Sequence, residues 1–241
     1  MKFDVITIFP SLFNGFLKHG IIGKAIKKGI IEIELHNLRD FSMDKHKKVD
    51  DKPYGGKRGQ ILMLEPIYNA LNSIPRKEKS IKILLSPQGN LLNHLEAVRY
   101  SGYDQIILLC GRYEGVDERV REYLIDEDVS VGDYVLSGGE IPAMVFIEAV
   151  SRLIPGVVGR QRSVNSDSFH KGLLDYPQYT TPREFKGWKV PEVLTSGNHK
   201  KISEWRLKKS LENTLKKRPE LFKKIKLSNH EKKILKLIEE E

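Results

Sequence analysis

Residues 110–140 constrain the fold of this chain more than any other part of its sequence. They hold two glycine-bearing turns, 111–115 and 132–139, and each follows an apolar run typical of a buried strand. A third such turn, 86–89, follows the apolar run 81–85. Glycine lets the backbone approach a ligand closely, and ligands of open α/β sheets bind at the carboxyl ends of strands. Each turn alone is compatible with an ordinary tight turn, but three in succession predict a cavity formed largely by backbone.

Several common nucleotide sites are excluded by their missing motifs. The chain has no G-x-x-x-x-G-K-[ST] loop, and no G-x-G-x-x-G segment follows a predicted strand. The glycine-rich first turn of Rossmann-type methyltransferases is also missing. A nucleotide-like ligand would therefore have to be held in another way.

The order of apolar runs predicts an α/β fold with a mostly parallel sheet. The expected amino-terminal elements are a strand at 3–9, a helix at 11–28, a half-buried strand at 30–35 and a long loop at 40–60. Strands and helices then alternate through residue 154, and the last helix begins near Pro142.

The polar segment 159–170 has no periodicity and is predicted to be a linker between domains. It divides a first domain, 1–158, from a second, 171–241. Helical patterns at 199–217 and 229–240 predict that the second domain is small and helical.

Positive charge is concentrated at the carboxyl end. The chain carries a formal net charge of +9, and residues 199–241 hold 14 Lys or Arg against 7 Asp or Glu. This asymmetry indicates either a polyanion-binding segment or a solvated face on lysine-rich helices. Trp205 lies beside Arg206, Lys208 and Lys209 in the sequence, which favours RNA.

Composition predicts a soluble cytoplasmic protein. Hydrophobic residues make up 39% of the chain, and no apolar run is long enough to span a membrane. Its one cysteine, Cys110, cannot form an internal disulfide and is expected to be a buried core thiol.

A family resemblance extends over nearly the whole chain. The segments GRYEG, DERV and VGDYVLSGGE resemble motifs of the bacterial tRNA (guanine-N1-)-methyltransferases of the TrmD type, in the SPOUT superfamily. Further matching segments follow in family order: FDVITIFP, DDKPYGG, LLSPQG, RLIPGV, DSF, LLDYPQYT and SGNH.

This resemblance implies a SPOUT-type α/β domain with a deep trefoil knot and a helical tRNA-binding domain after it. It also implies a homodimer whose active sites lie at the interface. The expected reaction transfers a methyl group from S-adenosyl-L-methionine to N1 of guanine at tRNA position 37, which maintains the reading frame. The family is associated with Mg²⁺, which the sequence neither supports nor excludes; the histidines have no metal-site spacing.

Three residues match the catalytic positions of the family. Asp167 would be the general base, Arg152 would stabilise charge developing on the guanine or orient that base, and Glu114 would orient donor or guanine. The sequence alone favours Asp167 as a helix N-cap or solvated loop residue, and only the resemblance favours it as the base. The alternative for Arg152 is a surface arginine late in a helix. Glu114 could instead form an ion pair with Arg112 or Arg119.

The resemblance also assigns binding residues. Those expected around the donor are Leu85, Ser86, Pro87, Gly111, Tyr113, Gly115, Val131, Gly132, Asp133, Tyr134, Val135, Leu136, Gly138 and Gly139. Tyr113 and Tyr134 could alternatively be core aromatics. Those expected to contact RNA are Asp50, Tyr54, Ser196, Asn198, His199, Arg206, Lys208 and Lys209.

Two positions depart from the family pattern. After DDKPYGG the chain reads Lys57-Arg58-Gly59-Gln60, which adds two positive charges, and Thr181 replaces an arginine usual in the family. Neither change falls on Asp167, Arg152 or the donor loops.

Two other functions compete with this one. The chain could be a non-catalytic RNA-binding protein that keeps the SPOUT fold, or a SPOUT methyltransferase acting at another RNA site, such as a ribose 2′-hydroxyl. Intact donor loops argue against the first, and the DSF and LLDYPQYT segments argue against the second.

Overall fold

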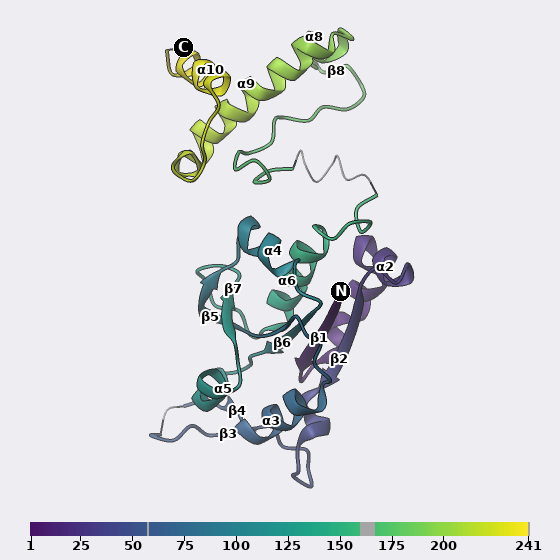
Figure 1. Ribbon diagram of the computed structural model, residues 1–241, viewed down its shortest axis with the longest axis vertical. Coiled ribbons are helices and arrows are strands. Elements are labelled where there is room, and N and C mark those ends of the chain that lie inside the picture. The colour runs from purple at the N-terminus through teal and green to yellow at the C-terminus, as the bar shows by residue number, and fades with distance from the viewer. Residues whose placement is uncertain (57, 160–166, 241) are drawn as a thin grey trace. The chain divides into compact units, whose positions relative to one another are not determined.

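A computed structural model describes residues 1–56, 58–159 and 167–240. The chain divides into two compact units, Met1–Gly159 and Arg160–Glu241 (Figure 1). Residues 160–166 of the predicted linker lie outside the described residues, and so does Lys57. Each unit is described by itself.

A five-stranded parallel sheet forms the centre of the first unit. Its strands lie in the order β2 (Glu32–Asn37), β1 (Lys2–Thr7), β6 (Gln105–Cys110), β5 (Ser80–Leu91) and β7 (Glu127–Ser130). Every pairing is parallel, and each residue of β6 is buried. The predicted α/β fold with a mostly parallel sheet is thus confirmed, and the continuous apolar runs are typical of strands covered on both faces.

Helices cover both faces of this sheet. Phe3 and Val5 of β1 join one core with α2 (Gly20–Lys27), α4 (His94–Tyr100) and α6 (Glu140–Ser151). Ile6 points to the opposite face and joins a second core with η2 (Leu38–Phe41), α3 (Leu64–Ser73) and α5 (Glu118–Tyr123). This alternation follows from the two-residue period of a strand.

The single helix predicted at 11–28 is wrong, because the segment is broken into η1 (Pro10–Phe13), α1 (Asn14–Lys18) and α2. The break falls at Gly20, whose φ of +66° does not fit a right-handed helix. Within the predicted loop 40–60, β3 (Asp50–Asp51) pairs antiparallel with β4 (Ile61–Leu62) just beyond it.

The second unit contains the two predicted helices, as α9 (His199–Lys217) and α10 (Asn229–Glu240). It also contains α8 (Glu192–Thr195), η3 (Pro219–Lys224) and an unpredicted hairpin of β8 (Glu184–Phe185) and β9 (Trp188–Lys189). No helix within the described ranges is both long and apolar enough to cross a bilayer.

Candidate functional site

A cavity of about 380 Å³ lies where β5, β6 and β7 present their carboxyl-terminal parts. Three chain segments surround it, within 84–88, 111–116 and 129–139, and they hold the three turns singled out in the sequence. Glu118 and Arg121 of α5 and Pro142 of α6 complete the lining.

All of the predicted donor-binding residues except Asp133 line this cavity. Tyr113 and Tyr134 are 47% and 57% exposed, so the alternative reading of them as core aromatics is wrong. Sequence reasoning missed several lining residues, among them Gln88 and the α5 pair Glu118 and Arg121. The pair is spaced i, i+3 directly after GRYEG, a spacing that places both side chains on one face of a helix.

The first turn differs from its prediction. Residues 86–89 do not follow β5 but form an irregularity inside it, since Leu85 and Asn90 both pair with Val129 of β7. A Cβ on Gly89 would lie 2.3 Å from the backbone nitrogen of Val129. Glycine is therefore needed at this position for close approach of two strands rather than for approach to a ligand.

Hydrogen bonds to backbone carbonyl oxygens fix the other two turns. The Gly139 N–H donates to the Gly111 oxygen at 2.8 Å, which ties the loop after β7 to the end of β6. The Ser130 hydroxyl donates to the Gly132 oxygen at 3.0 Å, and the Tyr134 hydroxyl donates to the Val131 oxygen at 3.2 Å. The loops thus hold their shape through contacts of their own.

A buried carboxylate lies behind these loops. Glu140 is 2% exposed, accepts a hydrogen bond from the Thr7 hydroxyl at 2.9 Å and pairs with Arg112 at 3.4 Å. Burial first, and the Glu140 charge second, raise the pKa of Cys110 well above its usual value. The prediction of an inert core thiol is confirmed by its burial.

The catalytic candidates are not brought together within one unit. Glu114 lines the cavity, and its side chain lies against Gly59, where an added Cβ would be 2.6 Å from the Glu114 Cγ. Arg112 and Arg119, its suggested ion-pair partners, pair with Glu140 and with Asp117.

Arg152 follows the last residue of α6, whereas the cavity lies at the first turn of that helix. A helix of 12 residues is about 18 Å long, so Arg152 is remote from the cavity of its own chain. Asp167 belongs to the second unit, and its proximity to a cavity stays a prediction.

The RNA candidates occupy varied environments. Tyr54 is fully exposed at the edge of a second, more open cavity of about 750 Å³, while Asp50 lies in β3. Asn198 caps α9 by accepting from the Lys201 N–H at 3.1 Å, and Ser196 donates to the Val193 oxygen at 2.8 Å.

The remaining candidates belong to α9. His199 is exposed at its start, and the Arg206 guanidinium lies 4.9 Å from the centre of the Tyr176 ring. Lys208 is half-buried, and Lys209 pairs with Glu212 at 2.5 Å. Four of the predicted RNA-binding residues, Ser196, Asn198, Arg206 and Lys209, thus make contacts within the second unit that give them a structural role.

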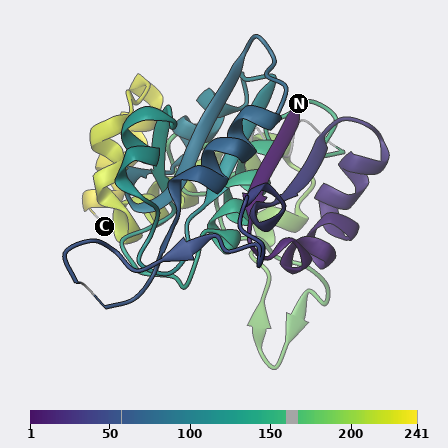
Figure 2. The same cartoon turned by 90° about the horizontal axis from the view of Figure 1, so that it is seen from below.

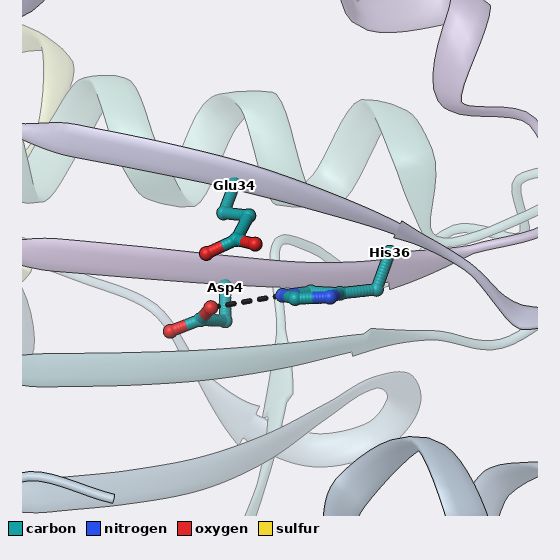
Figure 3. Close-up of side chains that lie close together, drawn as sticks. All are labelled: Asp4, Glu34 and His36. Atoms are coloured by element: carbon teal, nitrogen blue, oxygen red, sulfur yellow. Dashed lines mark hydrogen bonds and ion pairs between the residues drawn. The ribbon is translucent and has the colours of Figure 1, made fainter. Parts of the chain in front are cut away.

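A cluster of an acid pair and a histidine lies on β1 and β2, which contribute no residue to the cavity lining. Asp4 and Glu34 are register partners on β1 and β2, and His36 bonds to Asp4 at 2.8 Å (Figure 3). Lys2 contacts both carboxylates, at 3.0 and 2.7 Å, so an ammonium lies where a metal ion would bind.

Asp4 is fully buried, and Gln105 also donates to it, at 2.7 Å. Burial alone would raise the pKa of its carboxyl, but the hydrogen bonds from His36, Gln105 and Lys2 outweigh burial and lower that pKa. The cluster is best explained as a satisfied structural network.

A parallel α/β sheet with a cavity at the carboxyl ends of its strands is the arrangement in which α/β proteins of this class bind small ligands. The family model described as tRNA (Guanine-1)-methyltransferase TrmD matches residues 1–224, and the chain belongs to this family. A tRNA (guanine-N(1)-)-methyltransferase of Dictyoglomus turgidum is 50% identical over 241 residues, which cover 100% of this chain and 98% of the relative. A relative bearing the same name in Geobacter sulfurreducens is 47% identical, and the match covers 100% of this chain and 99% of the relative. Another in Staphylococcus aureus is 48% identical, and the match covers 98% of this chain and 96% of the relative.

Proposed function

We propose that this protein transfers a methyl group from S-adenosyl-L-methionine to N1 of guanine 37 of tRNA, beside the anticodon. The observation that carries the proposal is the convergence of three separate chain segments on one cavity, in a chain of this family. Because tRNA and the donor are cytoplasmic, the reaction is assigned to the cytoplasm, where it would maintain the reading frame.

The cavity suits such a donor in size and chemistry. Its volume of about 380 Å³ falls within the range of roughly 300–1,000 Å³ typical of small-molecule sites. Backbone N–H and C=O groups of the loops can read an adenine edge, and the exposed side chains of Val135 and Leu136 can cover apolar parts. When bound, the donor supplies an electrophilic methyl on a sulfonium, which leaves positioning as the main task of the protein.

The chain must also activate guanine N1, which carries a proton at neutral pH. Asp167 would accept this proton as N1 bonds to the methyl carbon, while the bond from that carbon to the donor sulfur would break and leave a neutral thioether. Negative charge then grows toward O6, where the Arg152 guanidinium stabilises it, and Glu114 at the cavity wall orients the guanine.

A homodimer resolves the distance between Arg152 and the cavity. Since Arg152 lies about 18 Å from the start of α6, it would serve the cavity of a partner subunit. An exposed apolar face supports such pairing. Ile141 and Val145 are exposed at i, i+4 spacing on α6, and Leu95 and Val98 are exposed on α4, which packs against α6.

Mixed dimers test this arrangement. If Arg152 and Glu114 act in one site but come from different chains, co-expression of Arg152→Ala with Glu114→Ala leaves one intact site in each mixed dimer. Random pairing then restores about a quarter of wild-type activity. No recovery in purified mixed dimers would refute the shared site.

Lysine-rich α9 and the loop that bears Tyr54 are the proposed RNA surfaces, with Asp50, Ser196, Asn198, His199, Arg206, Lys208 and Lys209 as contacts. Bases of the anticodon loop can be unstacked, which exposes the Watson–Crick edge that N1 methylation requires. Mg²⁺ is included as a candidate activator, and addition of EDTA to the assay tests it.

The decisive assay supplies labelled donor and an unmodified tRNA transcript with guanine at positions 36 and 37. We expect incorporation of label and a primer-extension stop at position 37, because an N1 methyl blocks pairing. Both should vanish with adenine at position 37. Donor binding without methyl transfer to any RNA would favour the non-catalytic alternative, and label at another nucleotide would favour the other SPOUT reaction.

A further inference from the structure

The β8–β9 hairpin has a well-defined tip. Its strands pair Glu184 with Lys189 and Phe185 with Trp188, so the connecting loop has two residues. Lys186 and Gly187 have φ angles of +52° and +81°, as a type I′ turn requires. A loop of this type fixes the register and therefore the face on which each side chain lies.

One face of the hairpin is aromatic. Phe185 and Trp188 lie directly opposite each other, with ring centroids 6.1 Å apart and planes inclined by 58°. The next pair, Glu184 and Lys189, belongs to the other face and is joined by an ion pair at 3.7 Å.

The aromatic face is uncovered within the part of the second unit that the structure describes. Phe185 and Trp188 are 54% and 74% exposed, and every residue from 178 to 189 is exposed. In Figure 2 the hairpin, drawn as pale green arrows, extends away from the other elements of its unit. A two-stranded hairpin is marginally stable on its own, so two exposed aromatic rings on it point to a binding partner.

The charges around the rings favour a polyanion. Residues 183–189 hold three basic residues, Arg183, Lys186 and Lys189, against the single acid Glu184, and the Lys186 ammonium lies 5.6 Å from the Phe185 ring centre. Residues 167–240 carry 18 Lys or Arg against 10 Asp or Glu. Protein interfaces are depleted in lysine, whereas aromatic side chains beside cations are typical of surfaces that bind unpaired nucleotides.

We propose that Phe185 and Trp188 stack on an unpaired base of the substrate RNA while Lys186 contacts its phosphate. The inference rests on the proposed function, to which it adds an RNA contact outside the donor cavity. Stacking explains why the rings are exposed in the free protein, since each would be covered only in the complex.

The test compares Phe185→Leu and Trp188→Leu with Trp188→Phe in the full-length protein. Leucine keeps an apolar side chain but removes the ring, whereas phenylalanine keeps a ring. The Kd for the tRNA transcript, the Kd for the donor, the dimer dissociation constant and the circular dichroism spectrum are measured for each variant.

Each leucine variant should weaken RNA binding about 5- to 150-fold, the range of one base stacked on one ring. Trp188→Phe should keep most of the affinity, and donor binding should be unchanged. Wild-type RNA affinity in both leucine variants would overturn the proposal, and so would a loss of dimerisation without a loss of RNA affinity. If the wild-type protein methylates tRNA normally, either result refutes only the proposed hairpin contact. If the wild-type protein neither binds RNA nor transfers a methyl group, the proposed function and the hairpin contact are both refuted.

Discussion

Replacing Gly139 with alanine tests whether the cavity depends on close backbone contact between its loops. The glycine has φ −79° and ψ −4°, which alanine adopts without strain, so only the added methyl matters. That Cβ would lie 2.6 Å from the Cys110 Cα and 2.9 Å from the Gly111 nitrogen. Ordinary carbon contacts are near 3.5–4.0 Å, so the end of β6 and the start of α6 must separate by about 1 Å.

Backbone atoms of a buried strand cannot rotate away, so we expect a loss of about 1–3 kcal/mol in the free energy of unfolding. The hydrogen bond from Gly139 to Gly111 would lengthen, and two walls of the donor cavity would move apart. A misplacement of about 1 Å can slow a reaction on the order of 100-fold. Urea denaturation, donor titration and single-turnover methyl transfer measure the three effects.

Gly15→Ala is the matched control. No atom lies within 4 Å of the Cβ position at Gly15, which belongs to helix α1. Alanine there should raise stability by about 0.5–1 kcal/mol and leave donor binding unchanged. Wild-type stability and donor affinity in Gly139→Ala would refute the argument that the contact shapes the cavity.

Three further outcomes follow from the same structure. Asp167→Asn should lower kcat about 10²- to 10⁴-fold with unchanged donor affinity, because it removes the proposed base; an unchanged kcat in single-turnover kinetics would exclude that role. The pKa of the Asp4 carboxyl is lower in the folded than in the unfolded protein, so its ionised form stabilises the fold. This stabilisation is fully present above the unfolded pKa, near 3.9, and is lost as the pH falls through the folded pKa. The stability advantage of wild type over Asp4→Asn should therefore shrink below about pH 4 in urea titrations, and a pH-independent difference would contradict it. Since burial raises the pKa of Cys110, a thiol reagent should label it only after denaturant is added; rapid labelling of the folded protein would count against this.

Much of the fold could be predicted from local patterns. The apolar run of β6, the largely apolar segment that contains β1 and the helical periods of α9 and α10 were sufficient to place those elements, whereas β7 has only one apolar residue, Val129. The break at Gly20 and the return of β5 to β7 after Leu85 were not predictable in this way. The first involves close packing between the adjoining helices α1 and α2, where a Cβ on Gly23 would meet the Lys18 backbone. The second depends on a tertiary contact, because Gly89 lies against the Val129 backbone.

Most of the cavity lining was predictable because its residues are consecutive in three motifs, whereas donor binding by these residues stays a prediction. Glu118, although it lies in the DERV segment, and Arg121 were not assigned to the cavity, because the geometry of helix α5 rather than the motif itself directs their side chains there. The aromatic face of β8–β9 was missed because two-residue strands have too few positions to show a period. The trefoil knot and the roles of Arg152 and Asp167 stay predictions, since they depend on chain path or on contacts between units and subunits.

The most direct test of the account is mass spectrometry of nucleosides from tRNA treated with the protein and donor. The account predicts 1-methylguanosine, at most one per tRNA, formed only when guanine occupies position 37. A 2′-O-methylated nucleoside, or a methylated base other than guanine, would contradict the central claim that the cavity formed by these loops serves N1 methylation of tRNA guanine.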